Sequence, residues 1–123
     1  MRSKRVLVVE DDAVISMAIE AEIADAGHAV IGPFGCCADA LGSLADGPPD
    51  AAVLDLRLRD GPCLDLARAL RRRGVPFLVY TGSVSSAKPR GPFEGAPWIE
   101  KPAPTGRIAA ALDALLRAHA LAA

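Results

Sequence analysis

The chain lacks a net charge of either sign and any long apolar run. Fourteen Lys and Arg residues stand against fifteen Asp and Glu residues, which gives a formal net charge of −1. No global field therefore attracts nucleic acid or an anionic membrane, and we expect neither as a partner. No apolar run approaches the ~20 residues of a membrane span. The run behind the basic start, residues 6–9, is also too short for a signal peptide, so we expect a cytoplasmic protein.

Cysteine is scarce and lacks metal-binding spacing. Cys36, Cys37 and Cys63 are odd in number and form no Cys-x-x-Cys pair. This pattern argues against a disulfide framework and against a zinc site, and it predicts reduced thiols in a cytosolic protein.

The length predicts one domain. The chain has 123 residues, of which 51% are hydrophobic, enough for a packed core. It contains no linker-like segment between two folding units. We therefore expect a single domain over residues 1–123 with no output domain.

Short apolar runs alternate with segments of helical spacing. The runs at residues 6–9, 29–31, 51–54 and 77–80 are nearly continuous, which is typical of strands buried on both faces. Apolar stripes between and after them predict helices, at Ile15, Ile19 and Ile23; Leu41 and Leu44; Leu66 and Leu70; Ile108, Leu112 and Leu115. The alternation predicts a doubly wound α/β fold with a parallel sheet.

One crossover departs from this alternation. Residues 82–97 contain three Pro and three Gly, which disfavour a long helix. We expect a short helix near residues 84–88, or a loop, between the fourth and fifth strands.

Acidic residues follow two of the predicted strands. Asp55 directly follows the run at 51–54, and Glu10, Asp11 and Asp12 follow the run at 6–9. Ligands of open α/β sheets bind at the carboxyl ends of the strands, so these carboxylates suggest one shared site. Lys101 follows Trp98-Ile-Glu and brings a cation to the same edge.

This combination predicts a site for a hard cation and a phosphoryl group. Asp11 and Asp55 would repel each other without a cation, and oxygen ligands without His or Cys favour Mg²⁺. Asp55 can also act as a nucleophile and form an acyl phosphate. Lys101 and the Thr81 hydroxyl offer a charge and a hydrogen bond to the phosphoryl oxygens.

Glu10-Asp11, Asp55, Thr81 and Lys101-Pro102, in this order and at these intervals, resemble the signature of receiver domains of bacterial two-component response regulators. The resemblance covers residues 6–116. It implies a five-stranded sheet of order 2-1-3-4-5 and phosphorylation of Asp55 by a histidine kinase or phosphotransfer protein. It also implies Mg²⁺ bound by Asp11, Asp55 and the Arg57 backbone carbonyl, with Glu10 acting through water.

The resemblance extends to the switch residues. Thr81 and Trp98 stand where the family has its switch pair, although Trp98 replaces the usual Tyr or Phe. Residues 76–82, Pro-Phe-Leu-Val-Tyr-Thr-Gly, resemble the Pro-Phe-x-Phe-Ala-Thr-Gly motif of a group of stand-alone receivers with a reduced fourth helix, and depart from it at Val79 and Tyr80.

Other residues have simpler interpretations. We expect Asp12 to cap the first helix and Asp60-Gly61 to form a turn. Three further predictions concern the surface: His28 and His119 at surface or boundary positions, a solvated arginine face at residues 71–73, and Phe93 as a candidate partner contact. Ile99, Leu112 and Leu116 fit either the core or the face of a weak homodimer.

Three functions remain open at this stage. The first is a phosphoacceptor that signals to an unknown downstream protein by contact and is not an enzyme beyond its own phosphorylation and dephosphorylation. The second is a phosphorylation-independent adaptor or phosphate sink with the same fold. The third, an Asp-dependent phosphohydrolase, is disfavoured because Arg57 stands where a general acid is needed.

Overall fold

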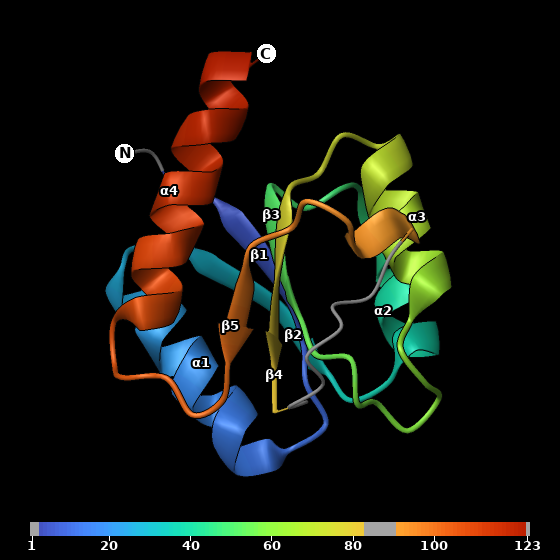
Figure 1. Cartoon of the computed structure of the whole chain (residues 1–123), viewed down its shortest axis with the longest axis horizontal. Helices are drawn as coiled ribbons and strands as arrows, with labels where there is room; N and C mark the ends of the chain where they lie inside the picture. The colour runs from blue at the N-terminus through green and yellow to red at the C-terminus, as the bar shows by residue number, and fades with distance from the viewer. Residues whose placement is uncertain (1–2, 83–90, 123) are drawn as a thin grey trace.

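A five-stranded parallel sheet forms the centre of the molecule (Figure 1). The computed structural model describes residues 3–82 and 91–122. The sheet order is β2-β1-β3-β4-β5, which confirms the predicted α/β fold of order 2-1-3-4-5. The strands are β1 (Arg5–Val9), β2 (Ala29–Phe34), β3 (Ala51–Leu54), β4 (Phe77–Thr81) and β5 (Trp98–Glu100).

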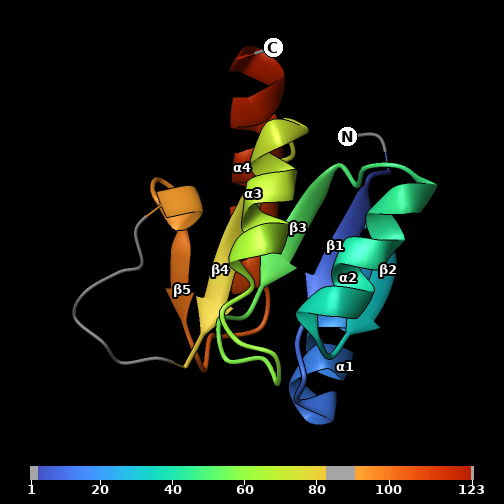
Figure 2. The ribbon, with the colours of Figure 1, turned by 90° about the vertical axis from the view of Figure 1, so that its right-hand side faces the viewer.

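Helices cover both faces of the sheet. Helices α1 (Ala13–Asp25) and α4 (Arg107–Ala122) lie on one face, and α2 (Cys37–Ser43) and α3 (Leu64–Arg72) lie on the other (Figure 2). The apolar runs of β1, β3 and β4 are therefore buried on both sides, as their near-continuous hydrophobicity predicts. No helix among the described residues is long and apolar enough to cross a membrane.

The core consists of two apolar layers separated by the sheet. The first packs α1 and α4 against the sheet through side chains that include Ile19, Ile23, Ile108 and Leu112. The second packs α2, α3 and the segment before β5, through side chains that include Ala40, Leu66, Leu70, Phe77 and Phe93. Successive residues of each buried strand supply the two layers in turn.

The crossover between β4 and β5 is only partly described. The expected helix near residues 84–88 lies outside the described residues. The described remainder of this crossover contains a single 3₁₀ turn, Gly91–Phe93. The fourth α-helix of the described chain is the long one after β5, α4.

A bend in β2 brings its end against the carboxyl end of β1. Gly32 has φ +98°, and a Cβ atom there would lie 2.8 Å from the Phe34 backbone nitrogen. Only glycine fits this position without strain. The pairing of β1 with β2 shifts register here, and the Glu10 amide donates to the Phe34 carbonyl at 2.9 Å. The bend thus anchors the backbone of a residue predicted to belong to the site.

Several predictions about surface residues are wrong. His28 is buried, accepts a hydrogen bond from the Lys4 amide at its Nδ1, and places its Nε2 3.5 Å from Asp113 Oδ1. Phe93 is also buried and packs edge-on against Phe77, with ring centres 6.2 Å apart. Phe93 is therefore a core residue, which excludes the predicted partner contact.

The arginines at the C-terminal end of α3 are not simply a solvated face. The Arg71 side chain donates to the carbonyls of Pro92 and Glu94 at 2.9 and 2.8 Å, and its guanidinium lies 4.6 Å from the centre of the Phe77 ring. Arg73 donates to the Leu44 carbonyl at 2.8 Å. Both arginines connect α3 to segments distant in the sequence.

The three candidates for a dimer face are buried within one chain. Ile99, Leu112 and Leu116 all belong to the core layer under α1 and α4. They contribute to folding and cannot form the proposed dimer face.

Candidate functional site

The carboxyl ends of four strands meet at one edge of the sheet. Glu10 and Asp11 follow β1, Asp55 follows β3, and Lys101 follows β5, while Thr81 is the last residue of β4. Carboxylate oxygens of Glu10, Asp11 and Asp55 lie within 4.8 Å of one another. The structure thus brings the predicted acidic residues together.

Lys101 connects two of these carboxylates. Its Nζ donates to Asp55 Oδ2 at 2.9 Å and also to Glu10 Oε1. Glu10 and Asp55 are only 4% and 3% exposed, whereas Asp11 is exposed to solvent. A buried pair of carboxylates close together needs such a cation to remain ionised.

Backbone amides fix the orientation of both buried carboxylates. The Arg57 amide donates to Asp55 Oδ1 at 3.1 Å, and the Asp12 amide donates to Glu10 Oε2 at 3.1 Å. The Asp12 side chain accepts from the Ile15 amide at 3.0 Å and caps α1, as predicted. The residues that follow each strand therefore turn back toward the site and hold it open at the sheet edge.

The two buried carboxylates differ in proton affinity. Burial, only partly opposed by the hydrogen bond from Lys101, raises the pKa of Glu10 to about 6. Burial also acts on Asp55, but hydrogen bonds from Lys101 and the Arg57 amide outweigh it and hold the pKa of Asp55 below its usual value. Burial disfavours the charged form of Lys101, yet the two carboxylates raise its pKa above its usual value. Of the two buried carboxylates, Asp55 is thus the one held more firmly in its ionised form.

The donor set fits a hard divalent cation. Three ionised carboxylates and one ammonium group give the cluster a formal charge of −2 (−3 + 1). All ligand atoms offered are oxygens, which suits Mg²⁺ better than softer metals, and Asp11 leaves the cluster open to solvent for retained waters. These three residues could therefore bind the ion predicted from the sequence.

The predicted switch residues lie beside this cluster. Thr81 is fully buried, and its carbonyl accepts from the Lys101 amide at 3.0 Å. Trp98 is half-buried and pairs with Val79 of β4, two residues before Thr81. It packs against the core layer under α2 and α3. The Lys101–Pro102 peptide bond is cis, as the family resemblance implies.

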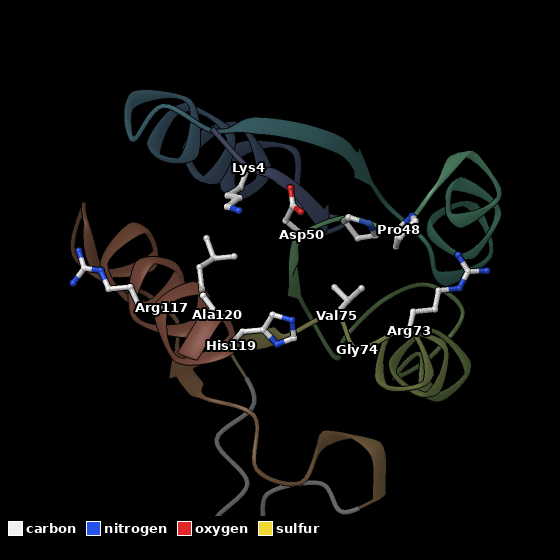
Figure 3. Close-up of a pocket in the computed structure, with 11 residues that line it drawn as sticks. Lys4, Pro48, Asp50, Arg73, Gly74, Val75, Arg117, His119 and Ala120 are labelled. Atoms are coloured by element: carbon white, nitrogen blue, oxygen red, sulfur yellow. The ribbon is translucent and has the colours of Figure 1, made fainter. Parts of the chain in front are cut away.

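A pocket away from this cluster lies at the other end of the sheet. It has a volume of about 490 Å³ and lies between the C-terminal part of α4 and the residues that precede β1, β3 and β4 (Figure 3). Lys4, Asp50, Arg73 and His119 line it, so its charged groups are mixed and include one carboxylate. The carboxylate cluster lies at the opposite edge of the sheet from this pocket.

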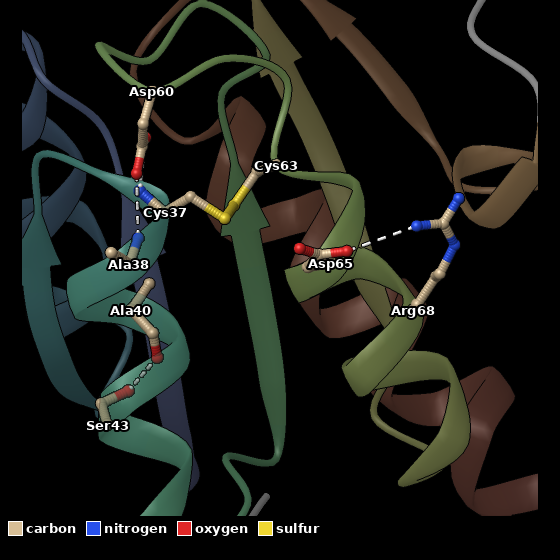
Figure 4. Close-up of a disulfide and its surroundings, with 8 residues drawn as sticks. All are labelled: Cys37, Ala38, Ala40, Ser43, Asp60, Cys63, Asp65 and Arg68. Carbon is tan, nitrogen blue, oxygen red and sulfur yellow. Dashed lines mark hydrogen bonds and ion pairs between the residues drawn. A yellow bond between two sulfur atoms is a disulfide. The ribbon is translucent and has the colours of Figure 1, made fainter.

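The prediction of reduced thiols is wrong for two of the three cysteines. Cys37 and Cys63 form a disulfide with an S–S distance of 2.08 Å and a Cα–Cα distance of 5.4 Å (Figure 4), while Cys36 is free. Cys37 lies just after β2 and Cys63 lies in the loop after β3. The connections that follow these two strands leave the sheet at the same edge. The position of each cysteine after a strand was therefore the signal for the disulfide, which the spacing of the cysteines along the chain did not reveal.

Asp60 also has a role beyond the predicted turn. Its two carboxylate oxygens accept from the Cys37 and Ala38 amides at 2.8 and 3.0 Å (Figure 4). Hydrogen bonds from the amides of Cys37 and Ala38 lower the pKa of Asp60. The turn itself is present, with the Gly61 amide donating to the Leu58 carbonyl at 3.1 Å.

Comparisons with known proteins agree with this geometry. The solved structure of SdrG from Sphingomonas melonis Fr1 is 33% identical, with 94% of this chain and 99% of SdrG covered and a TM-score of 0.79. The non-phosphorylated HemR receiver domain from Leptospira biflexa is 28% identical, with 91% and 93% covered and a TM-score of 0.78. No protein-family model matches the chain.

A curated relative extends the same similarity. The two-component response regulator PhoP from Pseudomonas aeruginosa is 33% identical over 117 residues, which cover 92% of this chain and 52% of PhoP. The chain therefore spans about half the length of PhoP. With a receiver fold, acidic residues at the sheet edge and relatives of this identity, the chain belongs to the receiver domains of two-component response regulators.

Proposed function

We propose that this protein accepts a phosphoryl group on Asp55 and transmits the signal by protein contact. The observation that carries the proposal is the set of contacts around Asp55: one carboxylate oxygen is held by Lys101 and the other by the Arg57 amide, beside Glu10 and Asp11. A carboxylate that remains ionised and has fixed orientation is prepared to act as a nucleophile.

The transfer follows from this arrangement. An Asp55 oxygen attacks the phosphorus of a phosphohistidine, the P–N bond breaks, and the donor imidazole leaves. Lys101, already 2.9 Å from Asp55, and the Thr81 hydroxyl then contact the phosphoryl oxygens. Asp11, Asp55 and the Arg57 carbonyl would bind Mg²⁺, with Glu10 acting through water. A bound Mg²⁺ neutralises negative charge on the phosphoryl oxygens during the transfer.

Turnover of a free substrate is a weaker proposal. A phosphohydrolase of this type needs an acid two residues after the nucleophile, and this position is Arg57, whose side chain is exposed. We therefore propose that its own chemistry is limited to self-phosphorylation and slow hydrolysis of the acyl phosphate, and that a cytoplasmic histidine kinase or phosphotransfer protein supplies the phosphoryl group.

A mass measurement tests the acceptor role. Incubation with Mg²⁺ and a small acyl phosphate should add one phosphoryl group to the wild-type protein and none to Asp55→Asn. Asp50→Asn, which removes a carboxylate at the opposite edge of the sheet, is the matched control and should be phosphorylated normally. An unmodified wild-type protein, or an equal adduct on Asp55→Asn, would contradict the proposal and favour a phosphorylation-independent adaptor.

We propose that the phosphodonor contacts an exposed apolar surface next to the site. Val14 and Met17 are 78% and 68% exposed in the first turns of α1, directly after the acidic residues. Val14 also lines a groove of about 400 Å³, whose other lining residues are mainly apolar and include the carboxylates Glu22 and Asp25. A phosphotransfer protein that brings its histidine to Asp55 would cover these apolar side chains.

Met17→Glu separates docking from chemistry. The substitution should slow phosphotransfer from the cognate kinase by about tenfold or more, because it places a charge in an apolar contact. It should leave phosphorylation by a small acyl phosphate unchanged. Equal loss with both donors would show that Met17 supports the site itself, and no loss with either would exclude this face as the docking surface.

A further inference from the structure

The loop after β3 is fastened to the start of α2 by two separate links. One is the disulfide between Cys37, the first residue of α2, and Cys63, the residue that precedes α3. The other is the pair of hydrogen bonds from the Cys37 and Ala38 amides to Asp60. Figure 4 shows both links side by side. The loop is therefore held at two points along its length.

The same loop carries the proposed phosphorylation site. It begins at Asp55, and its Arg57 amide orients the Asp55 carboxylate. The loop ends at Cys63, eight residues after Asp55, and Leu58 between these two residues is buried in the core layer under α2 and α3. A change in the conformational freedom of Cys63 should therefore change the mobility of the backbone that positions Asp55 and the Arg57 carbonyl.

Cys63 has a backbone conformation that depends on its surroundings. Its φ of +63° is the only positive value at a non-glycine residue in the described part of the chain. Residues with a Cβ atom adopt this left-handed conformation at an energetic cost, and it persists where neighbouring contacts hold it. The bond to Cys37 is one of those contacts, so its loss allows the loop to relax.

An open pocket lies beside the disulfide. Both cysteines are less than a tenth exposed, but they line this pocket of about 390 Å³ together with apolar side chains and the charged side chains of Asp60, Asp65 and Arg68. The pocket admits a molecule the size of a small thiol. Disulfides of proteins in a reducing compartment are usually reversible and redox-sensing.

We propose that Cys37 and Cys63 form a reversible dithiol–disulfide pair whose closure fixes the loop between Asp55 and Cys63. Its partners are small-molecule disulfides and thiols of the glutathione class. The effect on phosphorylation rests on the proposed function, whereas the redox reaction and the fixing of the loop do not.

The reaction balances as thiol–disulfide exchange. One cysteine thiolate attacks oxidised glutathione, forms a mixed disulfide and releases one glutathione thiolate. The second cysteine then attacks the mixed disulfide and releases the other. The two protein thiols lose two electrons and two protons, and oxidised glutathione gains both as two thiols. Reduction by excess glutathione is the reverse reaction.

Thiol labelling in glutathione redox mixtures tests the first part. After quenching with a maleimide, mass spectrometry should show two labels lost together as the oxidised fraction rises and regained together on reduction. Cys36→Ser should lose the same two labels. Failure of the native protein to open and close in these mixtures, or a bond that requires Cys36, would overturn the proposal.

Hydrogen exchange tests the second part without any phosphoryl group. The amides of residues 56–62 should exchange at least about fivefold faster in the reduced protein, while those of β4 remain unchanged. Cys37→Ser should resemble the reduced protein. The double variant Cys37→Ala, Cys63→Gly also lacks the disulfide, and its glycine adopts the left-handed backbone conformation of residue 63 without strain. This variant replaces Cys37→Ser in the experiment if the serine variant folds poorly. Equal exchange in both redox states would overturn the coupling.

Phosphorylation provides the final comparison. The oxidised protein should reach half-maximal phosphorylation by a small acyl phosphate at a Mg²⁺ concentration at least about threefold lower than the reduced protein, because its loop is preorganised. Identical Mg²⁺ dependence would contradict the link to the site. If neither form accepts a phosphoryl group, the proposed function fails, while labelling and hydrogen exchange still decide the redox reaction.

Discussion

The two helical layers of this molecule are held to the sheet in different ways. Helix α4 has 16 residues and buries Ile108, Leu112 and Leu116, and α1 buries Ile19 and Ile23 against the same face. Helix α2 has only seven residues and buries Cys37 and Ala40. The helices α1 and α4 thus offer long apolar stripes to the sheet, whereas α2 is short and buries fewer of its own side chains.

In the layer of α2 and α3, a disulfide and side-chain hydrogen bonds add to the apolar packing. The disulfide and Asp60 fasten α2 to the loop after β3, and Arg71 fastens α3 to the segment before β5. The other layer also has such a link, since Glu22 accepts from the Gly106 and Ala109 amides at the start of α4, but there it supplements a large apolar contact. Links of this kind can be broken one at a time, and the disulfide and the Asp60 hydrogen bonds fasten the loop that begins at Asp55.

The largest expected effect is in the packed layer. Leu112→Ala should lower the free energy of unfolding by about 2–5 kcal/mol, because it leaves a cavity in a fully buried position. Urea denaturation in oxidised and reduced conditions should give the same loss, since Leu112 and the disulfide lie on opposite faces and distant sites are additive. A loss that depended on redox state would mean that the two layers are not independent.

An intermediate effect is expected at Arg71. Arg71→Gln removes the hydrogen bonds to the Pro92 and Glu94 carbonyls and the contact with the Phe77 ring, and should cost about 1–2 kcal/mol. Arg72→Gln, at an exposed neighbouring position, is the matched control and should be nearly neutral.

The fluorescence of Trp98 provides a local readout of the Arg71 change. Trp98 is the single tryptophan of the chain and packs against the same core layer as Phe77 and Phe93. Its emission should shift to longer wavelength in Arg71→Gln before global unfolding. An unchanged emission together with unchanged stability would show that Arg71 does not hold the segment before β5.

The sequence predicted the site better than it predicted these links. Glu10, Asp11, Asp55 and Lys101 could be placed together because each directly follows a strand, and parallel strands end at one edge. The order of the strands followed from the family resemblance. The cap at Asp12 followed from its position at the start of the first predicted helix. Predictions failed where two segments distant in the sequence meet in space.

His28, Phe93 and the cysteine pair illustrate this failure. A single histidine or phenylalanine in a polar stretch gives no sign of the cavity that it fills, and Phe93 is buried only because the segment before β5 folds onto α3. The pairing of Cys37 with Cys63 depends on how two loops are placed across β1, which lies between β2 and β3. Composition and residue spacing do not reveal how close such residues come to one another in the fold.

The smallest expected effect concerns Asp60 and depends on pH. Its pKa is lowered in the folded protein by the Cys37 and Ala38 amides, so its contribution to stability is present above the unfolded-state pKa and is lost as the pH falls through the folded value. Since an unperturbed Asp titrates near 3.9, the stability difference between the wild type and Asp60→Asn should be constant near neutral pH and shrink below about pH 4.

Urea midpoints measured from neutral to acidic pH in the oxidised protein test this pH dependence. Asp39→Asn removes a carboxylate from the first turn of the same helix and serves as the control for charge alone. A difference between the wild type and Asp60→Asn that stays constant into the acid range would mean that the Asp60 hydrogen bonds do not require its charge. Because Asp60 is exposed, its effect should be smaller than that of the disulfide beside it, which makes the covalent link the stronger of the two that fasten the loop after β3 to α2.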